Sequence, residues 1–155
     1  MKTGKVILIG CVGLLVLCVL AAALVGAFVW YVSKDPEAME VSVEAPITVA
    51  RGEDCELVVS VVNRRPGTLH LTTIDVGESY LEGFNVLSTE PSYKASTTIP
   101  IDNSRSYTFE ADIPAGATNV FTFKLRASRK GRFTGDIDTC EGMRFVTHVV
   151  DTTVE

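Results

Sequence analysis

The positions of apolar and polar residues divide the chain into two parts with different periodicity. From Val6 to Val32 there are 27 residues without a charge, and most of them are apolar. Beyond about residue 40, apolar and polar residues alternate in short stretches that are separated by glycine and proline. A long uncharged run is typical of a membrane-spanning helix, and alternation is typical of β-strands with one buried face. We therefore expect one helix followed by one all-β domain.

The uncharged run is long enough to cross a bilayer. A helix of 27 residues rises about 40 Å, whereas the hydrocarbon core of a bilayer is roughly 30 Å thick. Trp30 and Tyr31 close the run, where aromatic rings favour the headgroup region. The positive mean hydropathy of the whole chain, +0.26, agrees with such a segment. The sequence predicts a single-pass anchor in contact with the lipid bilayer.

The flanking charges predict which side of the membrane each end occupies. The N-terminal tail carries Lys2 and Lys5, whereas all 19 acidic residues lie beyond the anchor. Because positive flanks stay in the cytoplasm, the N-terminus is expected inside and the rest outside, in the periplasm or at the cell surface. An acidic exported part also argues against nucleic-acid binding. The expected organisation is a cytoplasmic tail at 1–5, a transmembrane helix at 6–32, a linker at 33–39 and an exported domain at 40–155.

The N-terminal segment has two other interpretations. A signal peptide would be cleaved after small residues such as Val25-Gly26-Ala27, but the apolar run continues past that point to Val32. Leu8-Ile9-Gly10-Cys11 resembles a lipobox, but the apolar run before Cys11 is much shorter than the one after it. Both observations favour a retained anchor.

Small residues recur on one face of the predicted helix. Cys18, Ala22 and Gly26 are spaced four apart and therefore lie above one another. Such a ridge allows two membrane helices to approach closely, so helix-mediated self-association is possible. Alanine and glycine are also common in membrane helices without any such role.

The pattern of the remaining chain predicts β-structure. No stretch long enough for an amphipathic helix shows helical periodicity. Strands several residues long at regular intervals, separated by turns, predict an antiparallel β-sandwich of seven to nine strands. The segment 77–104 is difficult to interpret, and it holds one strand or two with an exposed loop around Thr89–Thr98. The clearest predicted strands are Cys55–Asn63, Thr68–Val76, Tyr107–Ile113, Phe121–Ala127, Arg132–Cys140 and Arg144–Val154.

Two runs of this pattern resemble bacterial immunoglobulin-like surface domains. The first run has Ile47, Val49, Gly52, Leu57, Val59, Val61 and Asn63. The second has Ile113-Pro114-Ala115-Gly116, then Phe121, Phe123, Leu125 and Ala127, then Gly131, Phe133 and Gly135. The resemblance implies an immunoglobulin-like fold and a role as a spacer, adhesion module or assembly part. The Cys–Trp–Cys core of true immunoglobulin domains is absent, because the single Trp30 belongs to the anchor.

The exported part contains two cysteines, Cys55 and Cys140. An even number of cysteines in an oxidising compartment favours a disulfide. If four strands lie between them, strand alternation puts both cysteines at the same end of the sandwich. A disulfide between Cys55 and Cys140 is therefore expected. This expectation would be wrong if the segment 77–104 held no strand, or if it held two strands.

A copper site is the main alternative for Cys140. Blue-copper sites use two histidines, one cysteine and a weak methionine, and the chain offers Cys140, Met143, His148 and His70. However, the usual order near the C-terminus is Cys, His, Met, whereas here Met143 precedes His148. We therefore expect no cofactor, with an electron-transfer or copper-handling domain as the alternative.

Catalytic signatures are missing from the sequence. No serine lies in a strand-turn-helix elbow, and no glycine-rich phosphate loop occurs. Asp136 and Asp138 share a strand face with Thr134 and resemble paired carboxylates, but solvated acids on an outer face explain them as well. The spacing of Asp136–Gly142 matches no calcium loop. An enzyme of unknown type remains only a second alternative.

Five basic residues surround one predicted hairpin of this otherwise acidic domain. Positive charge on adjacent strands suits an anionic partner such as lipid headgroups, an acidic polysaccharide or an acidic protein face. The competing interpretation is that lysine and arginine protect a sheet edge from aggregation. The residues are Lys124, Arg126, Arg129, Lys130 and Arg132.

Together these patterns predict a membrane-anchored interaction or structural module that faces the cell envelope and has no catalytic activity. Its expected partner is another envelope protein or a surface polymer.

Overall fold

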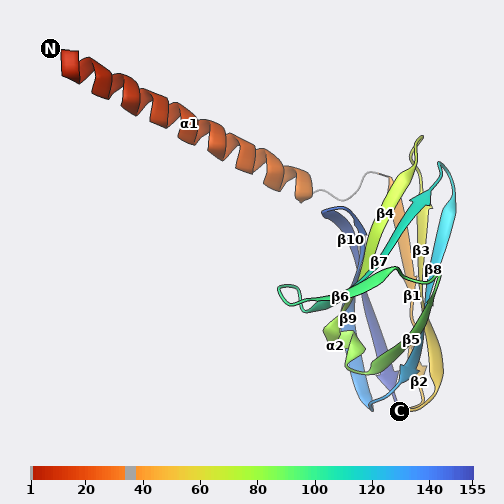
Figure 1. Cartoon of the computed structure of the whole chain (residues 1–155). Coiled ribbons are helices and arrows are strands. Elements are labelled where there is room, and N and C mark those ends of the chain that lie inside the picture. The colour runs from red at the N-terminus through yellow and green to blue at the C-terminus, as the bar shows by residue number, and fades with distance from the viewer. Residues whose placement is uncertain (1, 34–37) are drawn as a thin grey trace. The chain divides into compact units, whose positions relative to one another are not determined.

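The computed structural model describes residues 2–33 and 38–155, which form two separate compact units. The first unit is helix α1, Lys2–Val32, and the second is the β-domain (Figure 1). Most of the predicted linker at 33–39 lies outside the described residues. The first strand begins at Met39, one residue before the predicted start of the domain.

Helix α1 is apolar on every described face. From Leu14 to Val32 its mean hydropathy is 2.6, and it is the one helix among the described residues that is long and apolar enough to cross a membrane. Cys18, Ala22 and Gly26 are all exposed along it. A helix that is hydrophobic all round has no polar face to present to water, which fits a signal anchor or a single span.

The β-domain is an immunoglobulin-like sandwich of two sheets (Figure 1). All strand pairings are antiparallel except that of β2 with β10. The four-stranded sheet has the order β1 (Met39–Glu44), β3 (Asp54–Asn63), β8 (Thr118–Ala127) and β5 (Phe84–Glu90). The six-stranded sheet has the order β2 (Thr48–Val49), β10 (Arg144–Val154), β9 (Gly131–Glu141), β4 (Leu69–Gly77), β7 (Ser104–Ile113) and β6 (Ala95–Ile99).

The alternation in the sequence becomes the inner and outer faces of these sheets. Leu57, Val59 and Val61 of β3 are buried, as are Phe121, Phe123 and Leu125 of β8. The intervening polar residues face away, because successive side chains of a strand point to opposite sides. Leu71, Ile74 and Val76 of β4 and Ile137 of β9 complete the core from the other sheet.

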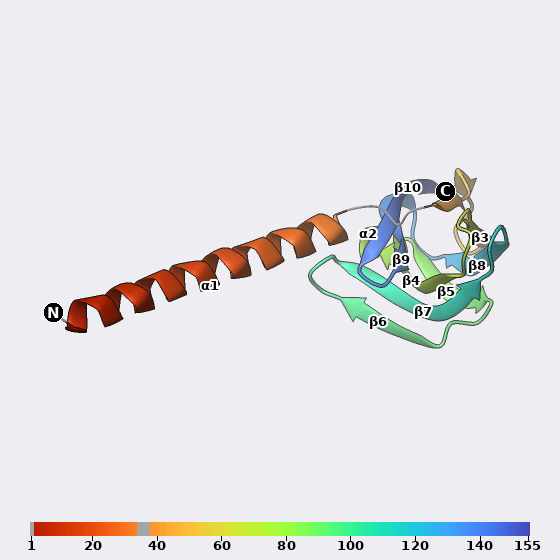
Figure 2. The ribbon, with the colours of Figure 1, turned by 90° about the horizontal axis from the view of Figure 1, so that it is seen from above.

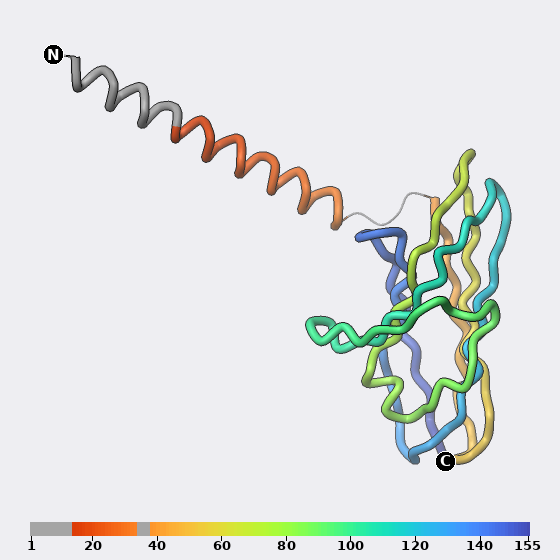
Figure 3. Tube along the Cα trace, viewed as in Figure 1, coloured from red at the N-terminus to blue at the C-terminus, as the bar shows by residue number. Residues whose placement is uncertain are grey.

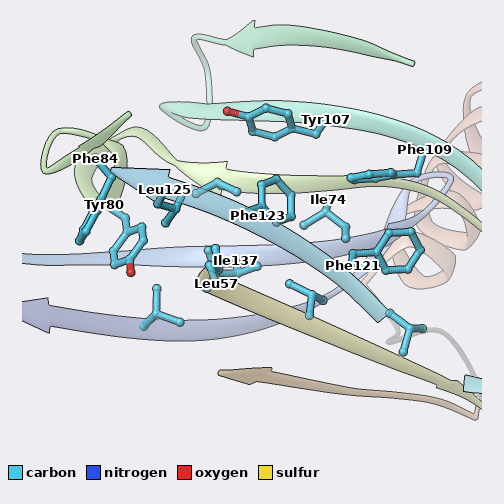
Figure 4. Packing of buried hydrophobic residues seen from close by; sticks show 14 of the residues in the cluster. Leu57, Ile74, Tyr80, Phe84, Tyr107, Phe109, Phe121, Phe123, Leu125 and Ile137 are labelled. Carbon is cyan, nitrogen blue, oxygen red and sulfur yellow. The ribbon is translucent and has the colours of Figure 1, made fainter. Parts of the chain in front are cut away.

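Aromatic rings lie along the centre of the core. The ring of Phe109 is 4.8 Å from that of Phe121, and the ring of Tyr107 is 5.1 Å from that of Phe123. Both pairs meet edge to face, the arrangement that aromatic quadrupoles favour. Figure 4 shows these side chains, which come from β7 and β8 of opposite sheets. These contacts therefore hold the two layers together.

The segment 77–104, which the sequence left unresolved, contains two strands and a short helix. Helix α2, Glu78–Leu81, follows β4 directly, and Tyr80 on it is fully buried. Its hydroxyl lies 2.9 Å from the hydroxyl of Thr152, so the buried phenol is hydrogen-bonded. Strand β5 then joins one sheet and β6 the other. Part of the loop expected around Thr89–Thr98 is in fact strand β6.

The second strand in this segment makes the predicted disulfide wrong. Five strands, not four, separate β3 from β9, so β3 and β9 run in the same direction. Cys55 lies near the start of β3 and Cys140 near the end of β9, which puts them at opposite ends of the sandwich. Both cysteines are free thiols.

Candidate functional site

A cleft on the outer face of the six-stranded sheet is the most distinctive surface of the β-domain. Its volume is about 410 Å³. Asp75 of β4 and Asp136 and Asp138 of β9 lie on its floor, and Asp102 belongs to the turn between β6 and β7. No lysine, arginine or histidine lines it. The cleft therefore concentrates negative charge on a concave surface.

Two of these aspartates face each other directly. Asp75 is the cross-strand partner of Asp138, a pairing that ordinarily destabilises a sheet. One carboxylate oxygen of Asp75 is buried and has no hydrogen-bond partner. Thr147 donates a hydrogen bond to Asp138 over 2.5 Å, but burial still raises the pKa of Asp138, and Asp136 and Asp75 raise it further. The cleft thus holds carboxylates that lack compensating positive charge.

Cys140 is the one thiol that lines this cleft. Its sulfur lies 3.6 Å from a carboxylate oxygen of Asp75, and the residue is buried. Burial raises the pKa of this thiol to about 12, and the neighbouring aspartates act in the same direction. A thiol with this pKa stays protonated at neutral pH, and nucleophilic attack requires the thiolate. Cys140 is therefore a structural cysteine.

Apolar side chains border the acidic floor along β10. Phe145, which lines the cleft, is 47% exposed, and Val149 two positions beyond Thr147 is 68% exposed. Met143, in the turn before β10, is 60% exposed. Phe145 is paired with Cys140 and Val149 with Asp136, so the apolar strip runs directly beside the carboxylates. An exposed apolar strip rimmed by polar side chains marks a candidate interaction site.

The predicted copper ligands do not come together. Cys140 faces the outer cleft, whereas His148 is paired with buried Ile137 and so faces the inner side of the same sheet. Met143 is exposed in a turn, and both ring nitrogens of His70 contact carboxylates, Asp112 at 2.6 Å and Glu110 at 2.7 Å. Among the described residues no group of three or more His, Cys, Asp or Glu is arranged to hold a metal. Copper handling is not favoured.

The five basic residues do not form one surface either. Strands β8 and β9 belong to different sheets, so Lys124 and Arg126 face outward on one side and Arg132 on the other. Arg126 pairs with Asp54 at 2.7 Å, and Arg132 pairs with Asp151 at 2.8 Å. Arg129 pairs with Glu82 at 2.7 Å, while Lys130 is exposed in the turn. Both strands are interior to their sheets, so edge protection does not explain these residues.

The sequence pattern identified only two of the four aspartates that line the cleft. Asp136 and Asp138 do share an outer face with Thr134, although the hydroxyl of Thr134 bonds to Asp151 instead of joining them. Asp75 and Asp102 were missed, because 27 residues separate them and only the pairing of β4, β7 and β9 brings them together. The one available signal was Asp75 itself, a lone acid in an apolar strand.

Comparisons with known proteins show the fold but identify neither a family nor a function. No family model matches the chain, and no curated protein matches it in sequence. Two structures of the CARDB domain of the PF1109 protein from Pyrococcus furiosus are similar, each with a TM-score of 0.50 over 78% of this chain and 97% of theirs. They are 15% and 12% identical, and the first is a complex with di-metal ions.

A further similar structure belongs to an enzyme. AvmM, which catalyses macrocyclization in alchivemycin A biosynthesis, is 9% identical, with a TM-score of 0.51 over 77% of this chain and 89% of its own. At these identities a likeness concerns the fold alone. The CARDB structures are immunoglobulin-like β-sandwiches, which is the architecture described above.

Proposed function

We propose that this chain is a membrane-anchored interaction module of the cell envelope without catalytic activity. Helix α1 is the anchor, the N-terminus is cytoplasmic, and the β-domain lies in the periplasm or at the cell surface. The apolar helix and the lysines before it support this arrangement. The similarity to CARDB domains supports a binding role, whereas the similarity to AvmM shows that the fold also occurs in an enzyme.

The observation that carries the proposal is the outer cleft. It joins four carboxylates to an exposed apolar strip, and its thiol, Cys140, has a pKa raised to about 12 and is therefore not an activated nucleophile. The partner that fits best is another envelope protein presenting a basic segment with apolar side chains, because such a segment would neutralise the carboxylates and cover Phe145. An acidic surface polymer would be repelled by the same carboxylates.

The test is cross-linking of the full chain in its native membrane, followed by identification of the attached proteins. Asp136→Asn with Asp138→Asn should remove the attached partner and leave the chain folded in the membrane. Glu53→Gln with Glu56→Gln is the matched control, since it removes the same number of negative charges at exposed positions on the side of the four-stranded sheet. A partner retained equally by both variants would show that the cleft is not the contact surface.

A further inference from the structure

Three turns lie at the end of the β-domain where β1 begins, and we call them the entry end. They join β3 to β4 at residues 64–68, β7 to β8 at 114–117 and β9 to β10 at 142–143. Met39 at the start of β1 is paired with Asn63 at the end of β3, so the first turn lies beside the start of the domain. Figure 3 shows the entry end from the side, and Figure 2 looks down on it.

Hydrogen bonds and an ion pair hold the three turns together. The backbone N–H of Gly116, in the second turn, donates to the carbonyl oxygen of Asn63 at 2.8 Å. The side-chain amide of Asn63 donates to the carbonyl oxygen of Gly67, in the first turn, at 2.7 Å. Arg65, also in the first turn, pairs at 2.6 Å with Glu141, which directly precedes the third turn. The turns therefore form one preformed surface.

The exposed side chains of the entry end are mostly small or apolar. The three turns contain no acidic residue. Pro66, Pro114 and Ala115 are exposed, and Met143 is 60% exposed. Arg64 is exposed as well. Apolar side chains beside a cation suit the boundary between phospholipid headgroups and acyl chains, because binding there combines apolar burial with attraction to phosphate.

The acidic residues closest to these turns are neutralised by cations. Asp112 and Glu141 are the only acids within three residues of the turns along the chain, and Glu40 lies near the start of β1. The pairs are Asp112 with His70 at 2.6 Å, Glu141 with Arg65 at 2.6 Å and Glu40 with Arg64 at 2.8 Å. In contrast, the carboxylates of the outer cleft lack such partners. The entry end is therefore a part of this acidic domain that an anionic surface repels little.

The segment that joins helix α1 to the β-domain is short. Helix α1 ends at Val32 and β1 begins at Met39, so six residues connect them. A chain of that length spans at most about 20–25 Å, even when it is fully extended. Trp30 and Tyr31 favour the headgroup level at the end of the helix. With α1 in a bilayer, phospholipid headgroups are thus within reach of the entry end.

We propose that the entry end docks on the phospholipid headgroups of the bilayer that holds α1, with Met143 inserted at the headgroup–acyl boundary and Arg64 beside the phosphates. The ion pair of Arg64 with Glu40 is exposed on both sides, so a lipid phosphate can replace Glu40 at little cost. This inference rests on the proposed anchor, but on neither the outer cleft nor its partner. Docking orients the strands away from the membrane, and the outer cleft then faces sideways, toward neighbouring envelope proteins.

The experiment is fluorescence quenching of the labelled full chain in vesicles of phosphatidylethanolamine and phosphatidylglycerol, with the quencher attached to lipid headgroups. Cys11→Ala and Cys18→Ala remove the helix thiols, and Ala115→Cys adds the labelling site. Ile47→Cys is the matched control, because Ile47 is an exposed uncharged residue that follows β1 at the opposite end. Quenching at position 115 should be at least about fivefold stronger, because a ten-residue strand such as β3 separates the two ends by about 33 Å.

A double substitution separates docking from the proximity that the short connection alone creates. Arg64→Glu with Met143→Glu removes both proposed lipid contacts and leaves the connection unchanged, so quenching at position 115 should fall by about half or more. Arg129→Glu with Ile47→Glu is the matched control at the opposite end and should leave quenching unchanged. The match is close, because Arg129 and Arg64 have side chains that are both 61% exposed and both paired with a glutamate.

Two readouts distinguish the outcomes. Equal quenching at positions 115 and 47 would overturn the docking, and so would full quenching in the chain with Arg64→Glu and Met143→Glu. Flotation of the same chains with the vesicles tests the anchor separately. A chain that fails to float would overturn the proposed anchor and this inference with it, whereas a chain that floats without the expected quenching would overturn the docking alone.

Discussion

His70 is held between two carboxylates on the outer surface of the six-stranded sheet. The hydrogen bond to Asp112 raises its pKa most, and the hydrogen bond to Glu110 adds to this. Both bonds require N–H groups on both ring nitrogens, so they stabilise the imidazolium form. The three side chains come from β4 and β7, which makes the histidine a link between neighbouring strands.

The raised pKa of His70 predicts a small loss of stability with rising pH. Its contribution is fully present below pH 6.5, the ordinary pKa of histidine, and is lost as pH rises through the higher pKa of the folded state. Because the side chain is half exposed, solvent screens much of the effect. An NMR titration should show a pKa above the ordinary value that falls in Asp112→Asn. Glu44→Gln, an exposed carboxyl on β1, should leave it unchanged.

Cys55 and Cys140 predict a thiol pattern that distinguishes this fold from a disulfide-linked sandwich. Burial raises the pKa of both thiols, so alkylation of the native protein at neutral pH should be slow at both positions. After denaturation without reductant, peptide mass mapping should find both residues alkylated. Protection of this pair in the denatured, unreduced chain would contradict the strand order described above.

At the scale of elements, Asn63 connects two turns at one end of the sandwich. The residue is fully buried at the end of β3. Its amide nitrogen donates to the carbonyl oxygens of Gly67 at 2.7 Å and Ile113 at 2.8 Å, and its side-chain oxygen accepts from the backbone N–H of Arg65 at 2.9 Å. All the polar atoms of the Asn63 side chain are therefore hydrogen-bonded, and they hold the β3–β4 turn against the end of β7.

Asn63→Ala should lower the free energy of unfolding by about 1–3 kcal/mol, because it leaves the buried carbonyl of Ile113 without its side-chain partner and removes two part-buried hydrogen bonds to Gly67 and Arg65. Asn85→Ala is the control, since Asn85 is exposed on β5 and should change stability by no more than about 0.5 kcal/mol. Denaturant unfolding of the two variants measures the difference. Equal midpoints would mean that these turns are held by other contacts.

Secondary-structure elements differ in how clearly the sequence predicts them. Strands β3, β8 and β9 each bury one face, so their apolar residues recur at every second position. Strand β6 buries almost nothing, so its sequence carries no alternation for a pattern to detect. Helix α2 is a single turn that buries Tyr80, which is too short for helical periodicity. Because β6 gave no such signal, the segment 77–104 was counted as one strand for the predicted disulfide, and its second strand made that prediction wrong.

For the molecule as a whole, the proposed function requires helix α1 to hold the β-domain at a membrane. We expect the full chain to stay with membranes after alkaline carbonate washing, because a helix of this length and hydropathy is suited to span the bilayer. Leu17→Asp with Leu20→Asp puts two charges in the middle of the segment and should release the chain. Recovery of the wild type as a shortened soluble species beginning near Phe28 would indicate cleavage instead.

The features that follow from local periodicity could be predicted from the amino-acid sequence. An uncharged run of 27 residues predicts an apolar helix, and alternation along β3, β4, β7, β8, β9 and β10 predicts half-buried strands of a sandwich. The six clearest strands lie where that alternation placed them. Each of these predictions needs only neighbours in the chain, because side-chain direction in a helix or strand follows from backbone geometry.

Which residues meet across the fold depends on how the strands pair and pack. The aspartates of the cleft come from three distant segments, and the basic residues near β8 and β9 separate because the turn between them crosses from one sheet to the other. Strand β6 becomes an open edge because its position in the sheet order is last. The physical reason is that strand pairing depends on contacts between residues far apart in the sequence. These contacts are set by the packing of both sheets, so no single stretch of sequence predicts them.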